Sequence, residues 1–139
     1  MHSLKKQNDM SEKPQIIKDV GFDFSWSSKK VWALDEPVTE MPIEELLWHF
    51  DVPFWDSEGT DEYNLSPKQL LEDPEKEPTH WEMIQKADTS YPIDVMENKG
   101  RWLILDGLHR LVKLHLAGDK TVKIRIIPRS RIPEIEIKR

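Results

Sequence analysis

The chain has 139 residues, the length of one ordinary domain, and its 20 Lys and Arg against 26 Asp and Glu give a formal net charge of −6 at pH 7. The acidic balance argues against nucleic acid as a partner, because nonspecific nucleic-acid binding depends on basic side chains at the phosphates. The absence of Cys excludes disulfides, thiolate nucleophiles and Cys-based metal sites.

The sequence shows no segment typical of membrane insertion or export. No apolar run approaches the ~20 residues that span a bilayer, and the polar start lacks the apolar core of a signal peptide. Residues 1–15 carry almost nothing to bury, which predicts a disordered leader before a single domain over residues 16–139. We therefore expect a cytoplasmic protein without a membrane partner.

The first apolar segments of the domain have two different periods. Phe22, Phe24 and Trp26 alternate with polar residues, which predicts a strand or an extended strap across the core. Apolar residues at positions 43, 46, 47 and 50 have the spacing of an amphipathic helix. The stretch from Pro53 to Leu65 has no periodic apolar face and predicts a loop.

Two segments carry the signature of a capped helix start. Ser66-Pro67-Lys68-Gln69 places a hydroxyl at the N-cap, Pro at the first helical position and Gln three residues after the cap. Thr79-His80-Trp81-Glu82 has a similar box and predicts a helix to about Asp88.

The pattern after Pro92 is that of a small mixed sheet. Residues 93–96 and 101–105 predict two strands joined by a four-residue turn, the second an inner strand because it is apolar on both faces. Asp106 is the expected N-cap of a helix over residues 107–117, whose buried face would include His115 and which ends at Gly118. Alternation at residues 122–126 predicts another strand, and Ile135 and Ile137 predict a short last one. The expected fold is α/β (α+β), with helices flanking the sheet.

The junction Leu105-Asp106-Gly107-Leu108-His109-Arg110 carries the chemistry, because a buried strand there runs directly into a helix. Unpaired N–H groups of a first helical turn and the helix dipole attract anions. Gly107 lets a ligand approach the backbone, and His109 and Arg110 can add charge-assisted donors. Asp106 could cap the helix, hold a magnesium ion or act as a base. Simple helix capping is the alternative interpretation.

Residues 91 to 127, roughly a quarter of the chain, resemble the core of the ParB/sulfiredoxin superfamily. The resemblance lies in Tyr91-Pro92-Ile93-Asp94-Val95, the turn, the strand and Asp-Gly-Leu-His-Arg motif, the helix and Thr121-Val122-Lys123-Ile124. Upstream, the segment around Pro42 is similar to the family's leading strand-then-helix element. In motif the chain is closest to the ADP-dependent serine kinase type.

The resemblance implies a nucleotide (ATP, ADP or CTP) with Mg²⁺, its phosphates held along Gly107, Leu108, His109 and Arg110. By position, His109 and Arg110 match the family's phosphate-binding pair and Asp106 matches the Asp of the kinase-type motif, where it would be the catalytic and metal-binding residue. The expected activity is hydrolysis of the nucleotide or transfer of its phosphate to a small hydroxyl substrate.

Departures from the family narrow this expectation. Leu108 stands where sulfiredoxin has its reactive Cys, which excludes sulfinic-acid reduction, and ParB proper has a Glu-Arg-Arg motif and further domains. A kinase also needs a second carboxylate to deprotonate its acceptor. Asp51 is the candidate, although an Asp that ends a helix and faces water is the preferred explanation of this residue.

Two alternatives stay open. One is a non-catalytic, protein-binding or ligand-sensing module that uses an exposed aromatic and acidic surface near Trp48, Phe54, Trp55 and Tyr63. The other is a nuclease, which the acidic charge and the lack of a second identifiable metal-ligating acid disfavour.

Overall fold

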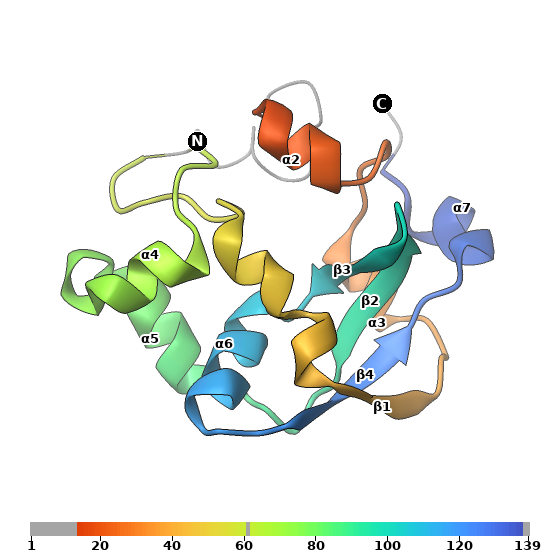
Figure 1. Ribbon diagram of the computed structural model, residues 1–139. Coiled ribbons are helices and arrows are strands. Elements are labelled where there is room, and N and C mark those ends of the chain that lie inside the picture. Colours follow the sequence, from red (N-terminus) through yellow and green to blue (C-terminus); the bar gives the residue numbers. More distant parts are fainter. Residues whose placement is uncertain (1–13, 61, 138–139) are drawn as a thin grey trace.

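The computed structural model describes residues 14–60 and 62–137 and has a four-stranded mixed sheet with helices around it, an α/β arrangement (Figure 1). The strands are β1 (Val38–Pro42), β2 (Ile93–Asn98), β3 (Arg101–Asp106) and β4 (Thr121–Ile126). Their order across the sheet is β1-β4-β2-β3. The predicted fold class is therefore confirmed.

The sheet combines one hairpin with one parallel pairing. β2 and β3 pair antiparallel, β4 pairs parallel with β2, and β1 pairs antiparallel with β4. The hairpin turn is shorter than predicted, because β2 extends to Asn98 and only Lys99 and Gly100 connect the strands. Both have positive φ, 53° and 83°, as the tightest hairpin turns require.

The position of β3 corrects the sequence prediction: it is an edge strand and not an inner one. It is apolar on both faces because both faces are covered, and Leu103, Ile104 and Leu105 are buried. Side chains take the place of a neighbouring strand, because the indoles of Trp48 and Trp26 donate to the carbonyls of Trp102 and Leu105. An edge closed in this way offers little to another chain's backbone.

The helices are α2 (Gln15–Val20), α3 (Ser28–Trp32), α4 (Pro67–Glu72), α5 (Pro78–Lys86), α6 (Leu108–Leu116) and α7 (Ile132–Ile135). Short 3₁₀ turns are η2 (Ile43–Glu45), η3 (Leu47–Asp51), η4 (Pro74–Lys76) and η5 (Arg129–Arg131). Figure 1 shows α4, α5 and α6 gathered on one side of the sheet and α3 and α7 on the other.

Two buried clusters lie against the sheet. One joins residues of α3, α7 and the segment before α3 to Met96, Leu103 and Leu105. The other joins Leu111 of α6 and residues of η2 to strand residues that include Ile93 and Ile124. A smaller cluster beneath α4, α5 and α6 completes the core. Both faces of the sheet are thus covered.

The amino-terminal elements differ in part from the sequence predictions. The predicted leader lies outside the described residues except at Pro14 and at Gln15, which begins α2. Phe22 and Phe24 are buried as an irregular strap, and only Trp26 makes a strand-like bridge, to Glu136.

The predicted helix over residues 43–50 is instead the pair of 3₁₀ turns η2 and η3, because the backbone breaks at Leu46, where φ is −114°. The apolar spacing still reports burial correctly, since Ile43 and Leu46 are buried. The loop prediction for residues 53–65 is confirmed among the described residues, with one bridge between Trp55 and Leu65.

The two predicted capping boxes have different outcomes. At Ser66 both reciprocal hydrogen bonds with Gln69 are present. At Thr79 the box is absent, because α5 begins at Pro78 and the Thr79 hydroxyl donates to Glu58 instead.

The carboxyl-terminal helix and last segment also differ from the sequence predictions. His115 was expected on the buried face of α6 but is exposed, with its ring against Phe50. The predicted last strand is the short helix α7, in which Ile135 packs into the core.

Candidate functional site

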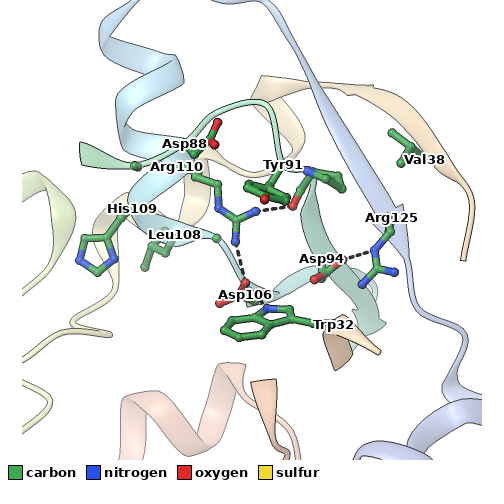
Figure 2. Close-up of a pocket in the computed structure, with 13 residues that line it drawn as sticks. Trp32, Val38, Asp88, Tyr91, Asp94, Asp106, Leu108, His109, Arg110 and Arg125 are labelled. Carbon is green, nitrogen blue, oxygen red and sulfur yellow. Dashed lines mark hydrogen bonds and ion pairs between the residues drawn. The ribbon is translucent and has the colours of Figure 1, made fainter. Parts of the chain in front are cut away.

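A cavity of about 720 Å³ lies where β3 enters α6. Its lining comes from α3, β1, the segment after α5, β2, the start of α6 and β4: Trp32, Val38, Ala87, Asp88, Tyr91, Pro92, Asp94, Asp106, Gly107, Leu108, His109, Arg110 and Arg125. Figure 2 shows most of these side chains around the Asp106–Arg110 pair. The predicted segment from Asp106 to Arg110 therefore lines one cavity.

Gly107 makes the turn from strand to helix possible. Its φ of 116° is one that side-chain-bearing residues rarely adopt, and a Cβ there would lie 3.2 Å from a side-chain carbon of Ile93. Gly107, and not Asp106, is the N-cap of α6, which corrects the sequence prediction, and no side chain caps the helix. The first-turn N–H groups are thus left without a capping side chain beside the cavity.

Asp106 is held by two donors from different parts of the chain. Its Oδ2 accepts a hydrogen bond from Trp32 Nε1 at 2.7 Å and forms an ion pair with Arg110 Nη2 at 2.6 Å. Arg110 also donates through Nη1 to the carbonyl of Pro92. Oδ1 takes part in none of these bonds, so Asp106 keeps one oxygen for a ligand or metal ion.

A second ion pair on the cavity wall was missed by the sequence reasoning. Asp94 Oδ1 accepts from Arg125 Nε at 2.7 Å, and the carboxylate is almost fully buried. Burial raises the pKa of Asp94, while its bond with Arg125 opposes that rise. Arg125 also donates to the carbonyls of Val31 and Leu34, so it joins β4 to α3. An Asp within an otherwise apolar strand is the sequence signal that could have indicated a buried ion pair at Asp94. The identity of its partner could not be predicted, because Arg125 lies 31 positions away.

His109 turns away from the Asp106–Arg110 pair (Figure 2) and stacks against Trp55, with ring centroids 4.3 Å apart. His80 Nε2 lies 2.7 Å from the Asp56 carbonyl and donates to it, and His80 Nδ1 lies 3.0 Å from His109 Nε2, so one of these two nitrogens donates to the other. Burial, and then His80, lowers the pKa of His109 to about 4. With this pKa the imidazole is neutral near pH 7, so by itself it does not offer a charged donor.

The charge of the wall is acidic on balance. Three carboxylates, Asp88, Asp94 and Asp106, face two guanidinium groups, Arg110 and Arg125. Hydrogen bonds from the hydroxyl and amide of Ser90 lower the pKa of Asp88. Within residues 14–60 and 62–137, no three His, Asp or Glu side chains are grouped to hold a metal ion by themselves.

Asp51 does not line this cavity. It is an exposed residue at the end of η3 and borders a separate hollow with Ser66 and Gln69. The structure therefore does not bring the two predicted catalytic carboxylates together.

The aromatic surface considered for a protein partner packs largely inward. Trp55 is buried, and the rings of His80 and His109 both stack on it. Trp48 stacks on His49 beneath the guanidinium of Arg101. These rings stabilise the interior and leave little exposed aromatic area there.

Comparison of the chain with protein-family models, curated proteins and solved structures finds no match. Across the part of the chain that the structure describes, no helix is both long and apolar enough to cross a membrane.

Proposed function

We propose that the cavity at the start of α6 binds a nucleotide with Mg²⁺. The observation that carries the proposal is the combination, in one cavity of about 720 Å³, of an N-terminal helical turn without a capping side chain and an arginine. A volume between about 300 and 1,000 Å³ is typical of small-molecule sites. The resemblance of residues 91 to 127 to the ParB/sulfiredoxin core supports the same ligand class.

The phosphates would lie against the amides of the first turn of α6, where the helix dipole favours negative charge. Leu108, His109 and Arg110 contribute these amides. The His109 imidazole instead packs on Trp55 and reaches Asp56 through His80, which holds this loop against the helix. Arg110 keeps N–H groups beyond the two that bond Pro92 and Asp106.

Magnesium fits the acidic wall. A bare polyphosphate would meet three carboxylates and only two arginines, whereas Mg²⁺ needs only one or two protein carboxylates and takes its other ligands from phosphates and water. Asp106 Oδ1 is the oxygen that would hold it, since Oδ2 is engaged by Trp32 and Arg110. The bound ion would neutralise phosphate charge beside Arg110.

Hydrolysis, or transfer of a phosphate to a small hydroxyl substrate, is the extension of this proposal. It needs a base that orients the attacking oxygen. All three carboxylates of the wall already accept hydrogen bonds: Asp94 from Arg125, Asp106 from Trp32 and Arg110, and Asp88 from the amide and hydroxyl of Ser90. Of the three, Asp88 is the exposed one, at the cavity rim. Release of inorganic phosphate from ATP or CTP, measured with and without a small alcohol or serine, tests this step.

The test of binding is a thermal-shift series with ATP, ADP and CTP, each with and without Mg²⁺. A ligand that binds only the folded state raises the melting temperature. We expect a rise with Mg²⁺ that is lost in Arg110→Gln and kept in Arg129→Gln, where an exposed arginine outside the cavity bonds the Glu97 carbonyl. The absence of any shift at millimolar nucleotide would refute the proposal.

A further inference from the structure

Two aromatic side chains on the cavity wall are unusually exposed. Trp32 is 57% exposed and Tyr91 64%, the highest values among the large apolar side chains that the structure describes. Both line the cavity that contains Asp106 and Arg110. Large exposed apolar surface in a concave site is typical of a ligand contact.

The exposed Trp32 ring is held in place on its polar side. Its Nε1 donates to Asp106 Oδ2 at 2.7 Å, and Arg125 fixes the end of α3 by donating to the carbonyls of Val31 and Leu34. Ser27 caps the start of the same helix. Because the ring is already ordered, a ligand that stacks on it loses little affinity to ordering the protein.

Neither ring is used for packing against another ring. Trp26, Trp48 and Trp55 all lie in aromatic contacts, whereas Trp32 and Tyr91 make no ring contact in the described part of the chain. In Figure 2 Trp32 lies next to Asp106, and Tyr91 is drawn beside the guanidinium of Arg110. A planar group that enters beside this pair therefore meets an aromatic wall.

We propose that Trp32 is the stacking platform for the base of the nucleotide, with Tyr91 as the second aromatic wall. The inference rests on the proposed function for the position of the phosphates and adds the chemical class of the rest of the ligand, a planar heteroaromatic ring. Stacking on an indole tolerates different bases, since each has a π face. The site thus selects nucleotides over polyphosphates and sugar phosphates.

The experiment compares the affinities for Mg²⁺-ATP and Mg²⁺-tripolyphosphate by calorimetry. The wild-type protein should bind ATP roughly tenfold more tightly than tripolyphosphate, in line with the strength of one base–aromatic stack. Trp32→Leu should bring this ratio close to one, and Trp32→Phe should preserve most of it. Phe keeps a ring but, like Leu, cannot donate to Asp106, so the pair isolates stacking from the hydrogen bond.

Leu116→Ala, at an exposed apolar residue of α6 outside the cavity, is the matched control and should leave the ratio unchanged. Equal wild-type affinities for the two ligands, or an unchanged ratio in Trp32→Leu, would overturn the stacking platform and leave nucleotide binding standing. Failure of both ligands to bind would overturn the proposed function together with this inference.

Discussion

Trp32 and Asp106 lie 74 positions apart in the chain and are joined by a hydrogen bond of 2.7 Å from the indole Nε1 to Oδ2. Through Asp106 the indole is connected to Arg110, so α3 and α6 meet at one carboxylate. Helix α3 is therefore part of the cavity wall. Exchanges at Asp106 should change the charge of the site.

Asp106→Asn should make nucleotide binding less dependent on magnesium. Removing one of the three carboxylates on the wall leaves it neutral against two arginines, so ATP without Mg²⁺ should bind more tightly than it does to the wild type. With Mg²⁺ the affinity should fall, because the ion loses its protein oxygen. Titrations at constant ionic strength measure both changes.

Asp51→Asn is the matched control for that exchange, since it removes one negative charge outside the cavity. It should leave both affinities near the wild-type values. An Asp106→Asn variant with the wild-type ratio of affinities with and without Mg²⁺ would contradict the assignment of the metal to Asp106.

Gly107→Ala should destabilise the protein by more than Gly118→Ala does. Both glycines have positive φ, 116° and 85°, but a Cβ at Gly107 would press on Ile93 at 3.2 Å, whereas one at Gly118 would meet nothing within 4 Å. We expect about 1 kcal/mol at Gly118 from backbone strain and roughly 1–3 kcal/mol more at Gly107. Urea unfolding of the two variants measures the difference. Equal losses would show that Ile93 accommodates the methyl group.

Arg125→Gln should cost about 3–5 kcal/mol of stability, because it leaves the buried Asp94 carboxylate without its partner. The loss should shrink as the pH falls, since burial already raises the pKa of Asp94 and the unpaired carboxylate would then take up a proton. Chemical denaturation at neutral and acidic pH tests both statements.

The double variant Asp94→Asn/Arg125→Gln is the control for that loss. It should recover part of the lost stability, because no charge is then left buried and unpaired. A loss below about 1 kcal/mol in Arg125→Gln alone would contradict the importance of the pair.

The sequence was sufficient where local patterns determine the structure. The apolar runs at residues 93–96 and 101–105 located the hairpin, the Asp-Gly pair after the second run located the start of α6, and the alternation at residues 122–126 located β4. These patterns also located the segment from Asp106 to Arg110. The partners of those residues could not be predicted, because they come from distant segments. Nothing local to Trp32 indicates that its indole meets Asp106.

The contribution of distant segments also explains why β3 was wrongly predicted to be an inner strand. An apolar strand ordinarily indicates neighbours on both sides, but here its outer edge is completed by the side chains of Trp26, Trp48 and His49. Similarly, His109 follows the motif of a phosphate ligand, yet the rings of Trp55 and His80 bury it as a neutral group. Only the tertiary packing distinguishes these two roles of a histidine.

His49 should make the protein acid-sensitive between about pH 6.5 and pH 4. Its ring is buried, with Nδ1 donating to the Leu46 carbonyl at 2.7 Å and Nε2 accepting from the Ile104 N–H at 3.1 Å. Protonation of Nε2 would remove that acceptor. Burial is the main cause that lowers the pKa of His49 from 6.5 to about 4.

Because the unfolded chain binds this proton at a higher pH than the folded protein does, the stability is complete above about pH 6.5 and is lost as the pH falls toward 4. The shift of His49 corresponds to about 3 kcal/mol, and His109, whose pKa is also lowered to about 4, adds to the loss in the same window. Urea unfolding from pH 7.5 to 4.5 measures the slope. His49→Gln keeps a donor and an acceptor without titrating, so it should reduce the slope to the part that His109 contributes, whereas His115→Gln, at an exposed ring, should leave the slope unchanged. Stability that is constant over this range in the wild type would show that folding does not lower the pKa of His49.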